Sequence, residues 1–411
     1  MKKSTLITAA TLIDASVGVA REGMNILVQD GRIVSISSAP SAVSDDSRID
    51  AGGAYVCPGL IDGHVHLFLD AGSAPRASFL NGDDEAKLQI ATRNAALAIS
   101  AGITTVRDCG GPAHLVFRFQ ESVRCGHILG PRMLAAGAPL TRPQGHCHFF
   151  GIEVTTPTEV RSAVDRQVRR GAAFVKLIAS GGGLTPGTRP SEADLAPSIM
   201  REAVVSAKAN GIHVAAHCHA VESIVRALDT GVDIIEHASF VRPHGPPKFD
   251  PQIAVRLKDQ GVVVSPTAIS GVRIAQTIRE SGTQNGHDQD AVARLESRRR
   301  HTAQFLELGV PILAGTDCGV ANTPFNSIVD ELLEYVNAGM STAAALRSAT
   351  CDSARYLGQP QLGRLETNCF ADLLFLSGNP LKNLNYLRTP LLVMKEGEIV
   401  CDTRHAPVAI S

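Results

Sequence analysis

The sequence of 411 residues contains no tryptophan, and aromatic residues of all kinds make up only 4% of the chain. Aromatic side chains are the usual stacking surfaces for single-stranded nucleic acids. An excess of charge is also missing, because 39 Lys and Arg face 40 Asp and Glu, which leaves a formal net charge of -1. Nucleic acids and anionic membranes are bound largely through positive charge. We therefore expect no nucleic-acid partner and no membrane partner.

Long hydrophobic runs and paired cysteines are absent as well. No stretch approaches the roughly 18 apolar residues that indicate a membrane-spanning helix. After Met1-Lys2-Lys3 the apolar residues are interrupted by Thr8, Thr11 and Asp14, so we predict a first strand and no signal peptide. The odd number of cysteines without a Cys-x-x-Cys pair argues against a disulfide framework or a zinc ribbon, and it favours a reducing, cytoplasmic location. The nine are Cys57, Cys109, Cys125, Cys147, Cys218, Cys318, Cys351, Cys369 and Cys401.

The two ends of the chain have the alternating pattern of short β-strands. Asp30-Gly31 between two such segments is a typical hairpin turn. The expected strands are 6–9, 25–29 and 33–37 near the N-terminus, and 371–376, 391–395 and 399–402 near the C-terminus. Neither end is large enough to enclose a core alone, so we predict one small β-sandwich that combines residues 1–57 and 365–411.

The middle of the chain, residues 58–364, repeats a short apolar run followed by a longer helical pattern. Eight such units over about 300 residues are the number and size of a (β/α)8 TIM barrel, so we predict an α/β fold of this kind. The eight expected strands are 60–67, 103–108, 133–138, 174–180, 213–219, 234–239, 262–267 and 311–317. The clearest expected helices are 157–171, 251–261 and 343–358.

Several of these strands end in residues that bind metals. Active sites of such barrels lie at the carboxyl ends of the strands. His64 and His66 are two residues apart and so point in the same direction, while Lys176 in an apolar strand is costly unless it is paired or modified. Other strands end in His217, His219, His237 and Asp317. A single histidine is more often an ordinary core residue, but this joint placement predicts a site for divalent Zn, Mn, Fe or Co.

Five motifs in this order resemble the amidohydrolase superfamily. The nearest branch is the prolidase-like and imidazolonepropionase-like group of zinc-dependent dipeptidases and N-acyl amino acid hydrolases. The motifs are Pro58 to His66, Val175 to Gly182, His217, Ile235 to Ala238 and Gly315 to Asp317, and the similarity covers nearly the whole chain. It implies a metal-dependent enzyme that hydrolyses carbon-nitrogen bonds.

The resemblance also implies a set of ligands for two divalent ions, with zinc the first expectation. Lys176 would react with carbon dioxide or bicarbonate to form a carbamate that bridges both ions, which turns a buried cation into an anion that the metals neutralise. The ligands would be His64, His66 and Asp317 for the more buried ion, His217 and His237 for the second, and Lys176 for both.

Three further roles follow from the same resemblance. A bridging hydroxide would attack the carbonyl carbon, and Asp317 would carry the proton to the leaving amine. His146 would contact the carbonyl oxygen and the oxyanion. His219 would contact the substrate without binding metal.

Loop residues give the expectation for the substrate. Arg142, Arg189 and Arg242 lie on loops after predicted strands and could bind a carboxylate, which favours dipeptides or N-acyl amino acids. His148 is interpreted either as a substrate contact or as an ordinary surface residue. Because the loop 181–190 is short, a carbamate, anilide, lactone or cyclic amide stays an alternative substrate. We expect a small-molecule substrate and a homo-oligomer.

Two alternatives remain from the sequence. His219-Ala220-Val221-Glu222 has the His-x-x-Glu spacing of mononuclear deaminases in the same superfamily, which use the glutamate as a proton shuttle. The chain could also be a metal-free structural scaffold, although all six expected ligands are present. Cys147 and Cys318 flank the expected site and are interpreted as structural.

Overall fold

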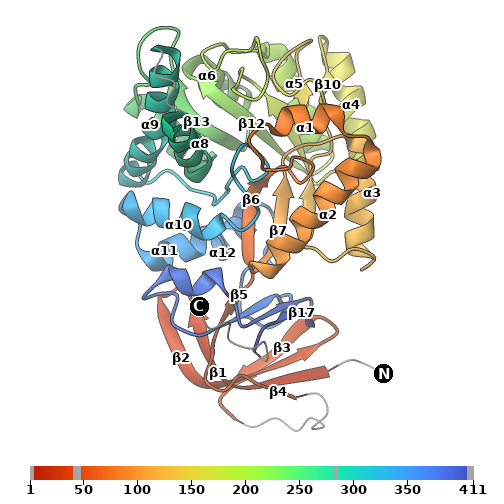
Figure 1. Ribbon diagram of the computed structural model, residues 1–411, viewed down its shortest axis with the longest axis vertical. Coiled ribbons are helices and arrows are strands. Elements are labelled where there is room, and N and C mark those ends of the chain that lie inside the picture. The colour runs from red at the N-terminus through yellow and green to blue at the C-terminus, as the bar shows by residue number, and fades with distance from the viewer. Residues whose placement is uncertain (1–3, 40–47, 281–285, 405–411) are drawn as a thin grey trace.

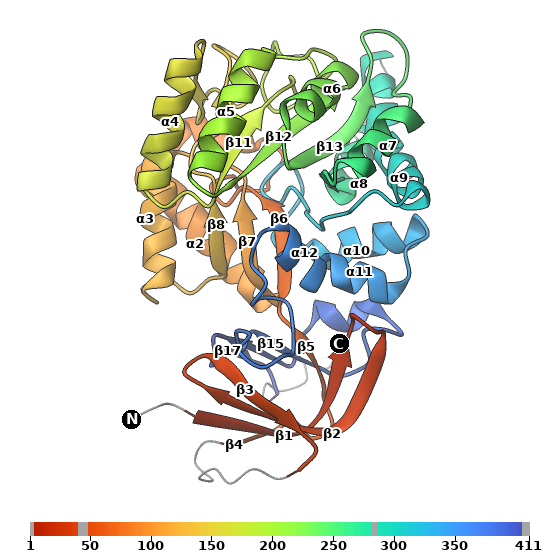
Figure 2. The same cartoon turned by 180° about the vertical axis from the view of Figure 1, so that it is seen from behind.

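The computed structural model describes residues 4–39, 48–280 and 286–404. It has two parts stacked along the long axis, a barrel surrounded by helices and a smaller sheet below it (Figure 1). Strands from the two ends of the chain lie side by side in the sheet, as the red and dark blue ribbons show in both views (Figure 2). The predicted fold class is therefore confirmed.

The lower part is a single sheet of eight strands in the order β17-β16-β15-β5-β1-β2-β3, with β4 also pairing with β1. Antiparallel pairing of β15 with β5 joins the two ends of the chain. Asp30 and Gly31 both have positive φ, 49° and 77°, as the predicted two-residue hairpin turn requires. The strands are β1 (Ser4–Asp14), β2 (Val19–Gln29), β3 (Arg32–Ser37), β4 (Arg48–Asp50), β5 (Tyr55–Pro58), β15 (Leu373–Leu376), β16 (Leu392–Lys395) and β17 (Glu398–Asp402).

This sheet encloses its own hydrophobic cluster, in which Leu12, Val28 and Phe375 are buried. Both ends of the chain contribute to that core, as the sequence predicts. The exact division into 1–57 with 365–411 and 58–364 stays a prediction, and residues 1–3, 40–47 and 405–411 of the first unit lie outside the described residues.

The barrel strands are parallel, and each begins within a few residues of its predicted position. They are β6 (Leu60–Val65), β7 (Ile103–Asp108), β8 (Arg132–Ala135), β11 (Phe174–Ile178), β12 (His213–Ala220), β13 (Ile234–Val241) and β14 (Val263–Ser265). The Ala173 amide donates to the Ala135 carbonyl at 2.8 Å and so connects β11 with β8. Two short strands, β9 (Leu140–Thr141) and β10 (Ile152–Glu153), extend the sheet beside β11.

The eighth barrel position differs from the prediction of a regular strand over 311–317. This segment closes the barrel, because the Leu313 amide donates to Val264 and the Asp317 amide donates to His64. Between them, however, the Ala314 amide donates outward to the Ser348 carbonyl at 2.9 Å. The ladder is thus interrupted, and only isolated bridges form at Ile312 and Cys318.

Helices surround the barrel on its outside (Figures 1 and 2). They are α1 (Pro75–Asn81), α2 (Asp84–Ser100), α3 (Ala113–Arg124), α4 (Pro157–Arg169), α5 (Pro197–Ala209), α6 (Val221–Thr230), α7 (Pro251–Asp259), α8 (Ala268–Glu280), α9 (Gly286–Leu308), α10 (Ile328–Asn337), α11 (Thr342–Ser348) and α12 (Cys351–Tyr356), with a 3-10 helix at Leu384–Arg388. None of the described helices has the length and apolar character needed to cross a bilayer.

The expected helix over 343–358 is instead two helices, α11 and α12. The break falls at Ala349, whose carbonyl accepts a hydrogen bond from the Ile61 amide at 2.7 Å. The next residue, Thr350, has φ −137° and ψ −107°, far from helical values, so the helix is interrupted there. The hydrogen bond between Ile61 and Ala349 therefore forms where the predicted continuous helix is divided. No local sequence pattern reveals this contact, because it joins distant segments.

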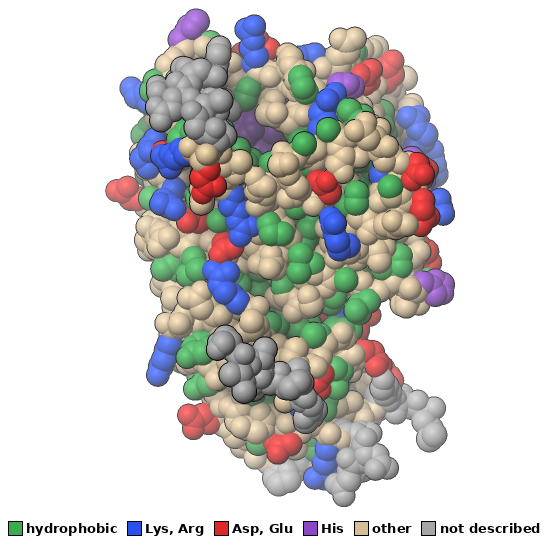
Figure 3. Space-filling model, in the orientation of Figure 1, with side chains coloured by type: hydrophobic (Ala, Val, Ile, Leu, Met, Phe, Trp, Pro, Cys, Tyr) green, Lys and Arg blue, Asp and Glu red, His purple; other side chains and the backbone are tan. Residues whose placement is uncertain are grey.

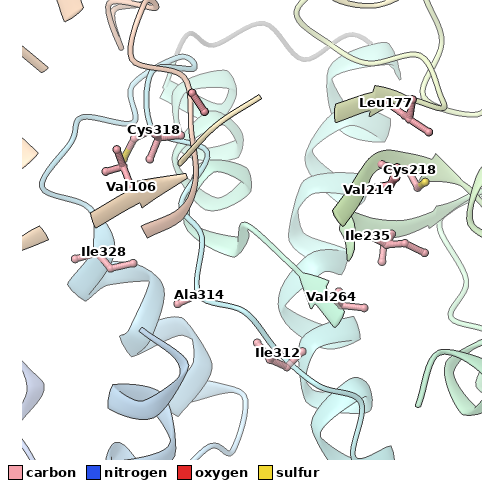
Figure 4. Packing of buried hydrophobic residues seen from close by; sticks show 14 of the residues in the cluster. Val106, Leu177, Val214, Cys218, Ile235, Val264, Ile312, Ala314, Cys318 and Ile328 are labelled. Atoms are coloured by element: carbon pink, nitrogen blue, oxygen red, sulfur yellow. The ribbon is translucent and has the colours of Figure 1, made fainter. Parts of the chain in front are cut away.

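Buried side chains between strands and helices form the main core (Figure 4). Leu177 of β11, Cys218 of β12 and Ile235 of β13 belong to it. Because side chains alternate along a strand, the neighbours of these residues are directed into the barrel. Cys218 is thus a packed thiol, as expected.

Candidate active site

One cavity of about 540 Å³ opens at the carboxyl ends of the barrel strands. Histidine side chains are visible at the bottom of a recess on this face (Figure 3). A volume of this size is typical of small-molecule sites. The cavity brings together eight of the predicted site residues, His64, His66, His146, Lys176, His217, His219, His237 and Asp317.

The two histidines of the first strand are held by their Nδ1 atoms. His64 Nδ1 lies 2.8 Å from Glu236 Oε2, and His66 Nδ1 lies 2.9 Å from the Gly110 carbonyl. An ionised carboxylate and a carbonyl oxygen can only accept, so these two contacts assign the proton to Nδ1 and leave Nε2 with its lone pair. Both Nε2 atoms point to Asp317 Oδ1, at 3.4 and 3.5 Å. Three potential ligands thus face one point.

The second group of histidines comes from β12 and β13. Potential ligand atoms of His217, His219 and His237 all lie within 4.8 Å of one another. His217 Nε2 donates to the Gly181 carbonyl at 3.2 Å, which leaves Nδ1 for a metal. His237 Nδ1 lies 2.7 Å from Thr267 Oγ1, which leaves Nε2. This group is therefore a second set of potential nitrogen ligands.

Burial favours the neutral form of His64, His217 and His237, which is the form that binds metal. Desolvation, followed by the charge of Lys176, lowers the pKa of His64 to about 4. Desolvation also lowers the pKa of His217 and of His237 well below its usual value, and the neighbouring His219 adds to the effect. At neutral pH these three rings are therefore neutral, and each keeps one nitrogen with a lone pair.

Lys176 of β11 lies among these groups with only 1% of its surface exposed. Its Nζ has no hydrogen-bond partner in the described parts of the chain, and the nearest carboxylate, Glu236, is 3.6 Å away. A buried ammonium group without hydrogen bonds is costly. The residues present thus fit the binding of divalent metal ions.

Glu236 and Arg107 support the site, and sequence reasoning missed both roles. Arg107 Nη1 donates to Glu236 Oε1 at 2.8 Å and to the Gly63 carbonyl at 2.9 Å. Desolvation would raise the pKa of Glu236, but the charges of Lys176, His64 and Arg107 hold it well below its usual value. Glu236 is therefore an anion that orients His64 through a hydrogen bond. Such outer partners of metal-ligating histidines strongly influence metal affinity.

The backbone of His237 explains how two consecutive residues of β13 reach His64. Glu236 hydrogen bonds to the His64 ring, and the His237 ring centroid is 5.3 Å from it. Neighbours in a regular strand point to opposite faces. His237, however, has a φ of 68°, and Asp317 has a φ of 62°. Such strained residues cluster at functional sites, and only the tertiary structure reveals them.

His146, on the loop after β9, lines the same cavity beside His217. Its ring centroid is 4.9 Å from that of His217, and burial lowers its pKa to about 3. Its Nδ1 has no hydrogen-bond partner among the described residues. A Cβ atom on Gly182 would come within 2.5 Å of His146 Nε2, so glycine at this position makes room for the ring. A free, neutral imidazole is thus held at the cavity.

Comparison with known proteins gives the family. Residues 55–400 match the sequence profile of the amidohydrolase family. The chain belongs to this family. An uncharacterised protein of Mycobacterium tuberculosis is 30% identical over 381 residues, with 91% of each chain covered. The ochratoxinase of Aspergillus niger is 26% identical over 324 residues, which cover 72% of this chain and 64% of that protein.

The structure of this amidohydrolase also matches that of a Xaa-Pro dipeptidase solved with methionine in its active site. The TM-score is 0.87 at 27% sequence identity, and the match covers 96% of this chain and 99% of the dipeptidase. The predicted superfamily and its prolidase-like relatives are confirmed. So is the enzyme class, because this family and its hydrolase neighbours support metal-dependent hydrolysis of carbon-nitrogen bonds.

The four predicted substrate contacts of this amidohydrolase do not line the cavity. Each already has a partner at short distance, so the geometry gives their expected role no support. Arg142 pairs with Asp194 at 2.9 Å, Arg189 with Glu192 at 3.5 Å and Arg242 with Asp250 at 4.0 Å, and His148 Nδ1 bonds the Gly145 carbonyl at 2.9 Å. The sequence around an arginine on a loop does not show which way its side chain points. Arg76 and Arg298 line the cavity instead.

Glu222, the residue behind the deaminase alternative, also lies outside the cavity. Its side chain is 64% exposed and pairs with Arg226 one turn later on α6. The two cysteines near the site behave as structural residues, because burial raises the pKa of Cys147 and of Cys318 far above neutrality. Their thiols therefore stay protonated and are poor ligands.

Proposed function

We propose that this amidohydrolase is a binuclear metal-dependent hydrolase of amide bonds in small molecules, acting on N-acyl amino acids or dipeptides. The observation that carries the proposal is the buried ammonium of Lys176 between two sets of ligand atoms. A lysine there makes chemical sense as a carbamate, which two cations neutralise together. The likeness to a Xaa-Pro dipeptidase supports a peptide-type bond.

The proposed ligands are six residues that line the same cavity. They are His64, His66 and Asp317 for one ion, His217 and His237 for the other, and carboxylated Lys176 for both. When bound, divalent ions such as zinc lower the pKa of water and polarise a carbonyl group.

The chain's own residues supply the proton transfer. The Asp317 carboxylate lies at the cavity, within 3.5 Å of both histidines of the first strand. We assign it as the base that takes a proton from water and returns it to the leaving amine, whose departure requires protonation. The neutral His146 ring, free at Nδ1, would donate a hydrogen bond to the carbonyl oxygen as negative charge develops there.

The cavity also supports this proposal over the two alternatives. A deaminase would need Glu222 near the reacting carbon, but that side chain is exposed and paired with Arg226. A metal-free scaffold would have no use for an ammonium group buried without a hydrogen bond beside neutral histidines.

Metal analysis tests the proposal. Protein reconstituted with zinc and bicarbonate should hold two ions per chain and hydrolyse members of a panel of dipeptides, N-acyl amino acids, carbamates and anilides. Lys176→Ala should lose one or both ions and the activity. The matched control is Lys208→Ala, because Lys208 is exposed on α5 and should be dispensable. One ion per chain in both the wild type and Lys176→Ala, or full activity of Lys176→Ala, would reject a binuclear site.

A further inference from the structure

We propose that Arg76 binds a free carboxylate of the substrate and selects anionic amides over neutral ones. This inference rests on the proposed function, because it names the substrate group that the same cavity recognises. Arg76 lies on α1, and no sequence motif marks it. Its side chain lines the cavity that also contains Lys176, His217 and Asp317.

The first observation is the state of the Arg76 guanidinium. Its Nε is buried yet has no hydrogen-bond partner in the described ranges of the chain, and no carboxylate in these ranges pairs with it. Its Cζ lies 5.5 Å from the centroid of Phe149, a ring that packs against Phe79 and Phe150. The aromatic cluster holds the cation at the cavity with its donors unused. Arginine presents planar donors that match a carboxylate.

The second observation is the charge of the cavity. Its charged lining residues are Arg76, Lys176, Arg298 and Asp317. Arg298 already donates to Thr267 and Ser270, at 3.1 and 3.0 Å. Lys176 and Asp317 belong to the proposed metal site. Arg76 is thus the lining cation left for a ligand, and an anion complements it.

The rest of the lining defines the other half of the substrate. The cavity wall contains apolar side chains from several elements, which favour an apolar group on the molecule that enters. They include Ile178, Leu184, Ile274, Leu295 and Val320. We therefore infer amides that combine one free carboxylate with an apolar side chain, such as N-acyl derivatives of leucine.

Two probes that differ only in the carboxylate test this inference. N-benzoyl-leucine carries it, and N-(3-methylbutyl)benzamide is the same molecule without it. The wild type should favour the acid in kcat/KM, and Arg76→Met should lower kcat/KM for the acid by about 100-fold while leaving that for the neutral amide within about 3-fold. Arg76→Lys should recover part of the loss, because it restores the charge without the planar donors. Arg189→Met is the matched control, since Arg189 is 76% exposed and does not line the cavity.

Calorimetric titration of the same two compounds separates this inference from the proposed function. The wild type should bind the acid at least about 10-fold more tightly than the neutral amide, and Arg76→Met should abolish that difference. Equal affinity of the wild type for both compounds, or an unchanged preference in Arg76→Met of native circular dichroism, overturns the inference whatever the activity. A lost preference in a protein that hydrolyses neither compound supports the Arg76 site and counts against the proposed reaction.

Discussion

Glu236 Oε2 lies 2.8 Å from Nδ1 of His64, and both side chains are completely buried. The other oxygen of the same carboxylate accepts a hydrogen bond from Arg107. The carboxylate thus fixes the ring tautomer that turns His64 Nε2 toward Asp317. Glu236 precedes the proposed ligand His237 in the sequence, but its side chain orients a different proposed ligand, His64.

This relationship predicts the effect of Glu236→Gln. The two oxygens of Glu236 accept hydrogen bonds from Arg107 and from His64. In the variant one of them is replaced by an NH2 group, which cannot accept, so the His64 ring loses its fixed orientation. We expect zinc affinity to fall by about 10 to 100-fold, measured by competition with a chelating dye. Glu121→Gln, which removes an exposed partner of Arg124, is the control and should keep wild-type affinity. Unchanged affinity in Glu236→Gln would exclude the orienting role.

His219 should affect catalysis and not metal content. Its Nδ1 lies 2.9 Å from Ser239 Oγ, and its ring stacks on His237 with centroids 4.6 Å apart. We expect His219→Asn to retain both ions and to lower kcat by about 100-fold, as loss of a polar contact to the reacting group does. His237→Asn should lose metal in the same measurement by atomic absorption. Loss of an ion in His219→Asn would make it a ligand.

Glu222 should be dispensable. Because the side chain is exposed and paired with Arg226, Glu222→Gln removes only a surface ion pair of small energetic value. We expect kcat/KM for amide substrates to stay within about 2-fold of the wild type. A drop of several orders of magnitude, together with ammonia release from an aminated heterocycle, would favour the deaminase alternative.

His301 should make the folded state sensitive to acid. It is buried on α9 against Phe240 and Phe249, and burial lowers its pKa to about 4 from the ordinary 6.5. The folded state therefore resists a proton that the unfolded chain takes up, so stability is full above pH 6.5 and falls as the pH drops toward 4. Between pH 7 and 5 this loss amounts to about 2 kcal/mol.

The measurement is denaturant unfolding of metal-free protein at pH 7 and pH 5. His301→Leu keeps an apolar side chain of related size at this position and has no proton to gain. We expect the variant to lose about 2 kcal/mol less than the wild type between the two pH values. An identical pH dependence of the two proteins would show that His301 is not responsible for the acid sensitivity.

The strand ends of the barrel were predictable because their signals are local. Alternation places His64 and His66 on one side of a strand, and an isolated lysine at 176 in an apolar segment marks an inward position. The positions of these residues in the fold agree with that reasoning. The predicted roles of individual ligands, the number and kind of ions, the oligomeric state and the cellular location stay predictions.

The expectations that differ from the structure depend on contacts between distant segments. The sequence does not show where the side chains of Arg142, Arg189 and Arg242 point, because the partner of a loop arginine depends on how the loops pack in the fold. Arg76 was overlooked for the same reason, since its significance comes from facing a cavity that other segments build.

The sequence by itself thus determined the fold class, the family and the histidines, lysine and aspartate that gather at the barrel mouth, because periodicity and residue type act over a few neighbouring positions. Tertiary structure alone decided how the barrel closes at 311–317, how the helix over 343–358 divides, and how Glu236 orients His64. The physical reason is that hydrogen bonds such as Ala314 to Ser348 and Ile61 to Ala349 join residues far apart in the chain. These distant partners override the local pattern where the barrel closes.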